Sequence, residues 1–245
     1  MLEICAGDIR SVCAAKAGGA DRVELCSALG EGGVTPSYGL IEQSIGVGIR
    51  VHVLVRPRGG DFVYNRDEVD LMVADIRHAA KAGAHGIVIG ALKPNGEIDI
   101  TSCQRLIEAA QGMSITFHRA FDLCADPFKA LDDIIALGCH RILTSGLAAT
   151  ALKGVPTLRK LVERAGNDII ILPGGGVNPA NAAEILCQTG AKELHASARA
   201  TYPSAMQFKR SGVSMGAPDS NEYLMKYTSP ETVAQIVAAM KTVLP

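Results

Sequence analysis

The chain has 245 residues, of which 48% are hydrophobic but only 4% aromatic, and its 24 Lys and Arg nearly balance 25 Asp and Glu. This balance argues against a nucleic-acid-binding protein, and no apolar run reaches the roughly 20 residues of a membrane helix. The first residues lack a secretory signal, and the seven Cys form no CxxC pair. We therefore predict a single domain, residues 1–245, in the reducing cytoplasm, with no nucleic-acid or membrane partner.

Strand-like apolar runs alternate with helical patterns along the whole chain. The eight predicted strands are Leu2–Ala6, Arg22–Ser27, Val51–Arg56, Gly86–Ala91, Ser114–Arg119, Arg141–Ser145, Asp168–Pro173 and Glu193–Ser197. Helix starts are visible at Asn178–Pro179 and Ser229–Pro230, where an N-cap residue precedes a Pro. The regular alternation of strand and helix predicts an α/β fold.

A glycine precedes seven of these strands at a nearly fixed distance. The seven are Gly19, Gly48, Gly83, Gly112, Gly138, Gly166 and Gly190. Each is expected to end a helix in the left-handed conformation that glycine adopts without strain. Eight strand–helix units of about 30 residues predict a single (β/α)8 TIM barrel with eight parallel strands. A doubly wound sheet is the alternative, although it does not normally need eight parallel strands.

The face of the strands that is expected to point into the barrel is unexpectedly polar. It carries Glu3, Cys5, Glu24, Cys26, Arg56, Thr116, His118, Ser145, Glu193, His195 and Ser197. Barrel interiors are normally filled by branched apolar residues, and a buried charge is costly unless it is paired. Two interpretations stay open: a structural salt-bridge network of Glu3, Glu24, Arg56 and His118, or a functional site at the C-terminal mouth of the barrel.

The loops after the seventh and eighth strands indicate anion binding. Three glycines follow Pro173, and the eighth strand ends near Ser197. Backbone N–H groups of such loops hold phosphate or carboxylate groups, and this is where TIM barrels usually bind phosphate. The predicted anion-binding residues are Arg56, Arg58, Arg119, Ser145, Gly174, Gly175, Gly176 and Ser197.

A set of longer motifs covers most of the chain. They are Arg22–Ser27, Glu31–Ser37, Arg56–Phe62, Thr116–Asp122, Leu143–Gly146, Gly174–Gly176 and His195–Ala198. Together they resemble the copper homeostasis protein CutC family, from Leu2 to about Tyr223. The resemblance implies a cytoplasmic TIM barrel that is often oligomeric, so we expect a homo-oligomer, either a dimer or a tetramer. It also implies copper handling, with Cys5 and Cys26 as candidate Cu(I) ligands.

The two cysteines lie on the inward face of neighbouring predicted strands, so their thiols can approach each other. Soft thiolates suit Cu(I), two ligands are enough for it, and His118 or Glu3 is a candidate third ligand. The alternative is that Cys5 and Cys26 pack as small buried hydrophobes. We interpret the remaining thiols as packing residues and expect no organic cofactor; these thiols are Cys13, Cys103, Cys124, Cys139 and Cys187.

The alternative function is an isomerase or lyase that acts by acid/base chemistry on a small anionic or phosphorylated metabolite. Glu3 or Glu24 is the candidate catalytic base, and His118 or His195 the candidate acid. No Lys occupies an inward strand position, so a Schiff-base aldolase is not expected. No GxSxG follows a strand, which argues against a nucleophile-elbow hydrolase.

The segment from residue 199 to residue 227, between the eighth strand and the last helix, is long for a connection in a compact domain. Its Tyr202, Met206, Phe208 and Met215 suit either a lid over the mouth or a contact between subunits. A third interpretation of the protein is a scaffold that binds a partner, although no surface in the sequence indicates one.

Overall fold

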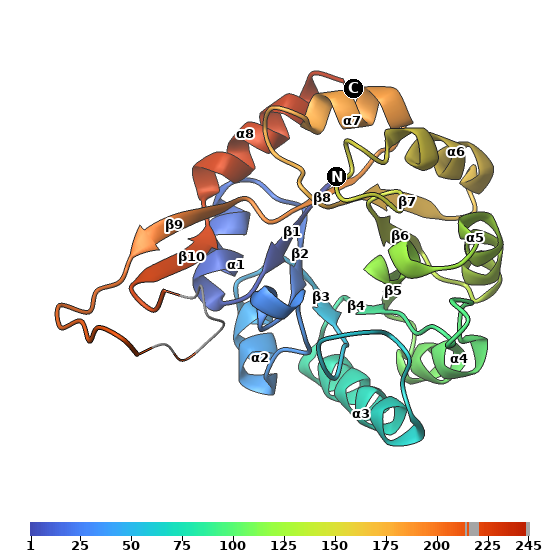
Figure 1. Ribbon diagram of the computed structural model, residues 1–245, viewed down its shortest axis with the longest axis horizontal. Helices are drawn as coiled ribbons and strands as arrows, with labels where there is room; N and C mark the ends of the chain where they lie inside the picture. Colours follow the sequence, from blue (N-terminus) through green and yellow to red (C-terminus); the bar gives the residue numbers. More distant parts are fainter. Residues whose placement is uncertain (214, 216–220, 244–245) are drawn as a thin grey trace.

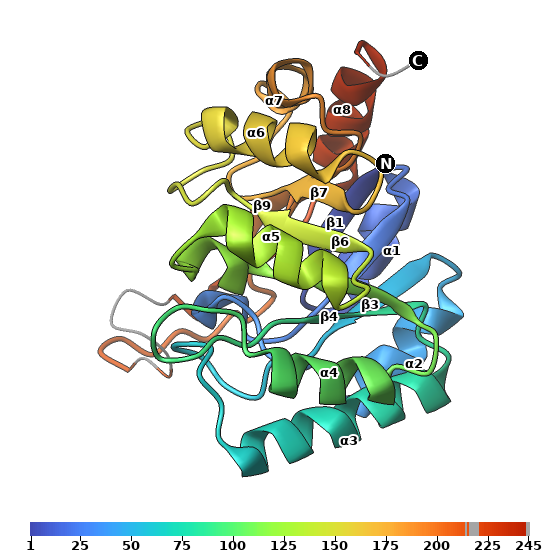
Figure 2. The ribbon, with the colours of Figure 1, turned by 90° about the vertical axis from the view of Figure 1, so that its right-hand side faces the viewer.

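A computed structural model describes residues 1–213, 215 and 221–243. The predicted fold is confirmed, because eight parallel strands form a nearly closed barrel with helices around it (Figure 1, Figure 2). The strands are β1 (Leu2–Ala6), β2 (Arg22–Leu25), β3 (Arg50–Leu54), β4 (Gly86–Ile89), β5 (Ser114–Phe117), β6 (Arg141–Thr144), β7 (Ile170–Pro173) and β8 (Leu194–Ala196). The α-helices are α1 (Ile9–Ala17), α2 (Tyr38–Gly46), α3 (Arg66–Ala82), α4 (Ile100–Ala109), α5 (Pro127–Ala136), α6 (Val155–Ala165), α7 (Ala182–Thr189) and α8 (Pro230–Lys241). None of the described helices is both long and apolar enough to span a membrane.

The strands follow one another around the barrel in chain order from β1 to β7, and β8 pairs with β1. In the described chain, β7 and β8 meet through an isolated parallel bridge between Gly174 and His195 rather than through a ladder. The barrel is therefore not fully closed at this point. The bridge brings the glycine loop after β7 beside a histidine that the sequence places at the mouth.

The apolar face of the strands packs under the helices, as predicted. Ile4, Val23, Val51, Ile87 and Ile115 are buried in one continuous core. Burying one such side chain stabilises the fold by about 1.5–3 kcal/mol. Since this face supplies the core, the opposite face of the same strands is free to carry polar side chains.

The predicted ends of the helices are largely confirmed. All seven glycines before strands have positive φ, between 51° and 90°, and Ser229 caps α8 with Pro230 as its first residue. The predicted start of α7 at Asn178–Pro179 is wrong, because the helix begins at Ala182 with Asn181 as its N-cap. The Asn178 side chain instead accepts a hydrogen bond from the Ala180 N–H at 2.9 Å, which closes a turn ahead of the helix.

The long connection after β8 forms a β-hairpin. Its strands β9 (Arg199–Pro203) and β10 (Leu224–Thr228) pair antiparallel, and the hairpin extends away from the barrel at the left of Figure 1. The Arg10 guanidinium of α1 anchors it, with its central carbon 4.7 Å and 4.3 Å from the ring centres of Tyr202 and Tyr227. Residues 214 and 216–220 of this predicted lid or subunit contact lie outside the described residues.

Two glycines at the ends of β4 leave room for histidine rings inside the barrel. A Cβ atom at Gly86 would lie 2.7 Å from ring atoms of His52 and from the Ser114 carbonyl oxygen, and one at Gly90 would lie 2.5 Å from His118 Cε1. Side chains do not tolerate such approaches without a shift of the neighbouring atoms. The glycines of β4 thus determine where His52 and His118 can lie.

We expect Gly86→Ala to lower the free energy of unfolding by about 1–3 kcal/mol, the usual cost of overpacking, because the Ser114 backbone cannot move without disturbing β5. Gly39→Ala in α2 is the matched control, since a Cβ there would meet no atom within 4 Å. The control should be neutral or slightly stabilising, because Ala favours a helix more than Gly does. Chemical denaturation measures both changes, and equal effects of the two substitutions would contradict the prediction.

Candidate metal and ligand site

A network of buried charges lies inside the barrel near the N-terminal ends of the strands. Arg22 donates to Glu3 Oε2 at 2.5 Å and to Glu193 Oε2 at 2.6 Å. Arg141 donates to the same Glu193 oxygen at 3.0 Å and to Ser114 Oγ at 2.8 Å. Burial acts to raise the pKa of Glu3, but Arg22 and then His195 lower that pKa well below its usual range. Glu3 is therefore ionised and held in place.

This network differs from the predicted set of Glu3, Glu24, Arg56 and His118. Glu3 pairs with Arg22 and His195, while Arg56 and His118 make no ion pair with it in the described chain. Arg22 and Arg141 share the inward parity of residues that the sequence did identify, since they lie two residues before Glu24 and four before Ser145. Extending the alternation back to the first residue of each strand would have found both arginines.

His195 connects this network to the mouth of the barrel. Its Nδ1 lies 2.8 Å from Glu3 Oε1, and its Nε2 lies 3.6 Å from Glu24 Oε2. Burial acts to lower the pKa of His195, but Glu24, Cys5 and Glu3 raise that pKa well above its usual value. Burial raises the pKa of Glu24, and the nearby His195 offsets only part of this rise. The pair can share and move a proton at the base of the mouth.

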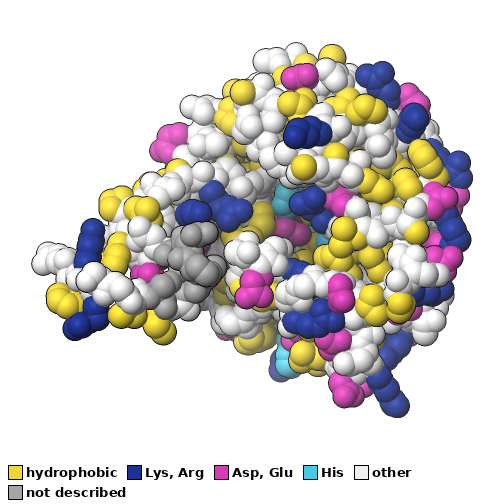
Figure 3. Space-filling view, in the orientation of Figure 1, with side chains coloured by type: hydrophobic (Ala, Val, Ile, Leu, Met, Phe, Trp, Pro, Cys, Tyr) yellow, Lys and Arg dark blue, Asp and Glu magenta, His cyan; other side chains and the backbone are white. Residues whose placement is uncertain are grey.

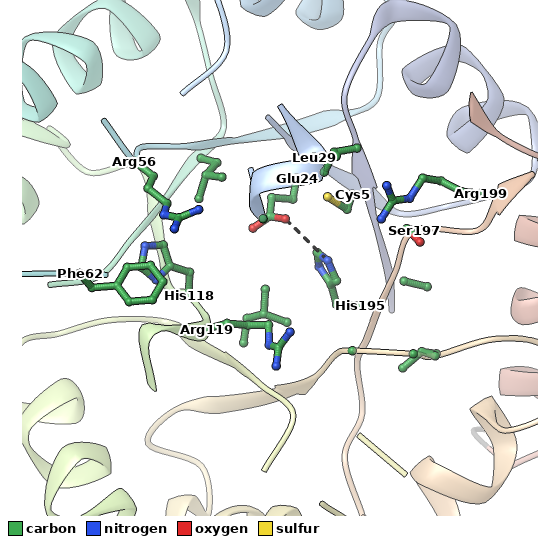
Figure 4. Close-up of a pocket in the computed structure, with 17 residues that line it drawn as sticks. Cys5, Glu24, Leu29, Arg56, Phe62, His118, Arg119, His195, Ser197 and Arg199 are labelled. Atoms are coloured by element: carbon green, nitrogen blue, oxygen red, sulfur yellow. Dashed lines mark ion pairs between the residues drawn. The ribbon is translucent and has the colours of Figure 1, made fainter. Parts of the chain in front are cut away.

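Cys5, Glu24 and His195 form a cluster that can hold a metal ion. One ligand atom from each of the three residues lies within 4.8 Å of the others, and the three side chains converge in Figure 4. Since Glu3 engages His195 Nδ1, the Nε2 atom is the one that faces Glu24. A carboxylate on the second nitrogen is the usual support of a metal-binding histidine. The sequence placed Glu24 and His195 among catalytic residues and did not predict them as ligands.

Cys26 lies next to this cluster, and the predicted approach of the two thiols is confirmed. The sulfur atoms of Cys5 and Cys26 are 3.5 Å apart. Cys26 is fully buried against Leu54 and Val88, and its thiol also lies 3.6 Å from the Ala6 carbonyl oxygen as a donor. The hydrogen bond with Cys26, together with burial, raises the pKa of the Cys5 thiol well above its usual value. The Cys5 thiol is therefore protonated at neutral pH when no metal is bound.

A cavity of about 330 Å³ opens above the cluster, at the C-terminal ends of the strands. Figure 3 shows it as a hollow in which histidine and acidic atoms lie deep and basic side chains border the opening. Of the predicted catalytic residues, Glu24, His118 and His195 line the cavity, and Glu3 lies beneath it. Of the predicted anion-binding residues, Arg56, Arg119, Gly175, Gly176 and Ser197 line it, whereas Arg58, Ser145 and Gly174 do not.

The arginines near the cavity have different partners. Arg56 donates at 2.7–2.8 Å to the carbonyl oxygens of Glu31, Gly33 and Gly60, and it stacks 4.9 Å from the Phe62 ring centre. This guanidinium joins two loops of the mouth. Arg58 donates instead to Glu68 at 2.5 Å, outside the cavity, because α3 supplies that carboxylate.

Asp122, which was not among the predicted site residues, organises the loop after β6. Its carboxylate accepts hydrogen bonds from Thr144 Oγ1 at 2.5 Å and from the Ser145 N–H at 3.0 Å. Arg119 donates to Asp122 at 2.7 Å and to Ser145 Oγ at 3.0 Å. Ser145 is therefore engaged in holding Arg119 at the edge of the cavity rather than lining it.

Two buried histidines inside the barrel are held neutral. Burial and the Arg56 charge lower the pKa of His118 to about 3, and burial lowers the pKa of His52 to about 4. His118 Nδ1 accepts the Ala120 N–H at 3.2 Å, so the neutral ring carries its hydrogen on Nε2. That Nε2 atom has no hydrogen-bond partner among the described residues. His118 is thus an unsatisfied donor in the wall of the cavity.

These two histidines predict a pH dependence of stability. Between pH 6.5 and about 4, the unfolded chain binds protons on both rings and the folded chain does not, so the free energy of unfolding falls as pH falls. Each histidine contributes at most about 1.4 kcal/mol per pH unit. We expect the double variant His52→Asn/His118→Asn to show a shallower dependence of the unfolding free energy on pH, by the equivalent of up to two bound protons. Denaturation at several pH values measures this slope. An unchanged slope in the double variant would refute the prediction.

The buried network of charges predicts that loss of Arg22 lowers the unfolding free energy more than loss of an exposed arginine does. Arg22→Leu leaves Glu3 without its closest cation inside the barrel, so we expect a loss of about 3–5 kcal/mol in unfolding free energy. Arg164→Leu, which breaks the exposed pair with Asp132, should cost no more than about 1 kcal/mol. Thermal or chemical denaturation compares the two variants. Similar losses in both would show that the network is not a main source of stability.

Comparison with known proteins identifies the family of this chain. The family model described as the CutC family matches residues 1–200. A family protein CutC of Bacteroides thetaiotaomicron is 50% identical over 98% of both chains. A human protein named copper homeostasis protein cutC homolog is 45% identical over 100% of this chain and 90% of its own.

Solved structures agree with the sequence comparison. The CutC structure from Streptococcus agalactiae matches 80% of this chain and 98% of its own, with a TM-score of 0.77 and 38% identity. Thiamine phosphate pyrophosphorylase from Pyrococcus furiosus matches at a TM-score of 0.60 and 17% identity, over 100% of this chain and 96% of its own, which reflects the shared barrel alone. The resemblance seen in the sequence motifs is confirmed: the chain belongs to the CutC family.

Proposed function

We propose that this protein binds copper as Cu(I) in the cytoplasm, through Cys5, Cys26 and His195 at the base of the barrel mouth. The observation that carries the proposal is the position of the Cys5 thiol, which lies 3.5 Å from the Cys26 sulfur and within 4.8 Å of ligand atoms of His195 and Glu24. The name of the human relative, copper homeostasis protein cutC homolog, supports copper as the metal.

The donor atoms favour a soft metal ion. Thiolate and imidazole are ligands that suit Cu(I). Metal–sulfur bonds of about 2.3 Å, the value for zinc, allow two sulfurs up to about 4.6 Å apart to bind one ion. The 3.5 Å between Cys5 and Cys26 is within that limit. Binding would displace the thiol proton of Cys5, and Glu24 lies close enough to accept it.

The third ligand differs from the sequence expectation of His118 or Glu3. Glu3 is occupied by Arg22 and by His195 Nδ1, so it orients the histidine instead of binding the metal. His118 lines the cavity but is not a member of the Cys5, Glu24 and His195 cluster. His195 is therefore the better third ligand.

A second candidate function is acid/base catalysis in the same cavity. The observation that favours it is the Glu24–His195 pair, 3.6 Å apart and open to a cavity that can hold a small molecule. Burial raises the pKa of Glu24 and the neighbouring carboxylates raise the pKa of His195, and groups with shifted pKa values that face a cavity are typical of acid/base sites. An isomerase or lyase would use this pair. The expected homo-oligomer, a dimer or tetramer, stays a prediction.

An anaerobic titration of Cu(I) in competition with a chromophoric chelator tests the copper proposal. Wild-type protein should bind one equivalent of Cu(I) tightly. Loss of a direct ligand should weaken binding more than the roughly 10–100-fold typical of an outer-shell change, so we expect a drop of at least about 100-fold in Cys5→Ser. His195→Asn should also bind more weakly, which separates the three-residue site from a site made of two thiols.

The control for this titration is Cys187→Ser, because Cys187 is an exposed thiol on α7 and is not a member of the cluster. It should keep the wild-type affinity for the first equivalent. The copper proposal fails if Cys5→Ser binds the first equivalent as tightly as wild type. It also fails if Zn²⁺, added in equal amount under the same conditions, displaces Cu(I) from the site.

A further inference from the structure

The cationic groups that line the cavity are not all neutralised. Arg56, Arg119 and Arg199 line it together with Glu24, and among the described residues Arg119 alone of the three arginines is paired with a carboxylate, that of Asp122 at 2.7 Å. Arg56 binds carbonyl oxygens and meets no carboxylate in the described chain. Arg199, at the base of the hairpin, has no side-chain hydrogen bond or ion pair within the described residues, and Figure 4 shows its guanidinium directed toward Cys5. Unneutralised cations around a pocket attract an anionic ligand.

A glycine loop brings backbone N–H donors to the same cavity. Gly175 and Gly176 line the cavity and have φ values of 99° and 74°, which other residues adopt only with strain. A Cβ at Gly175 would lie 3.8 Å from the Arg119 guanidinium carbon, so the loop and this arginine border the same space. In the described structure the Gly176 N–H makes no hydrogen bond. Backbone N–H groups of this kind bind the oxygens of an anion.

The remaining walls of the cavity are apolar. Leu29, Leu54, Phe62, Leu143 and Val177 line it between the charged groups. A bare inorganic ion would leave these side chains in contact with water alone. A ligand that fits all the walls therefore combines an anionic group with a short carbon skeleton.

We propose that this cavity binds a small phosphomonoester, whose phosphate lies between Arg119 and the Gly175–Gly176 loop in the field of Arg199. The carbon skeleton lies along the apolar wall and extends toward Glu24 and His195. The proposal names the ligand class for the second candidate function. It does not depend on copper, because no residue assigned to the phosphate is a proposed metal ligand.

Titration of the metal-free protein with glycerol 3-phosphate tests the proposal, at constant ionic strength held with chloride. The unfolding temperature should rise and saturate, and inorganic phosphate should act in the same way at higher concentration because it lacks the carbon skeleton. Acetate at the same concentrations should have a smaller effect, since it is a monoanion. Equal effects of acetate and glycerol 3-phosphate would overturn the assignment to phosphate.

Matched arginine variants locate the binding site. Arg199→Gln should raise the half-saturating concentration of glycerol 3-phosphate about tenfold, as expected for the loss of an unpaired cation near the phosphate, and Arg199→Lys should recover part of it because it keeps the charge. Arg66→Gln removes an exposed arginine of α3 and should leave the value unchanged. An unchanged value in Arg199→Gln, or no saturable rise for the wild type, would overturn the proposal. Since Cu(I) binding is measured separately on phosphate-free protein, either result leaves the copper proposal intact.

Discussion

The ion pairs of Arg22 with Glu3 and Glu193 are the constraint on which the interior of this barrel depends. Placing charges inside a barrel costs several kcal/mol per ion unless each is paired with good geometry. Arg22 meets this condition with contacts of 2.5 and 2.6 Å. Because the pair fixes the Glu3 carboxylate, it also fixes His195 Nδ1, and through His195 it determines how the cluster with Cys5 and Glu24 is arranged.

The barrel interior is thus divided along its axis. Near the N-terminal ends of the strands, paired charges take the place of the usual apolar filling, and near the C-terminal ends the Glu24–His195 pair and Arg199 line an open cavity. These groups are available to a ligand. The glycines at both ends of β4 contribute by leaving room for rings that neighbouring strands supply. The inward face of the strands therefore carries stabilising ion pairs near the N-terminal ends and groups that can contact a ligand near the C-terminal ends.

Much of the fold followed from local patterns in the chain. The eight strands and the seven glycines before strands were predicted because their signals are short-range: an alternating face, an apolar run, a glycine after a helix. The hairpin of β9 and β10 was predicted only as an extended connection, because pairing between residues 21 to 29 positions apart leaves no local signal. Its anchor is far more distant in sequence, since Arg10 of α1 contacts Tyr202 and Tyr227.

The sequence by itself determined the barrel, the inward position of Glu3, Glu24 and His195, and the neighbouring thiols of Cys5 and Cys26, because strand alternation assigns each residue to a face. The tertiary structure alone decided which of these groups are neutralised. Arg58 lies beside Glu68, Arg56 binds three carbonyl oxygens, and Ser145 is held by Asp122, all through contacts between separate elements. Pairing depends on distances of a few ångströms across the barrel, and the order of residues along a strand does not contain those distances.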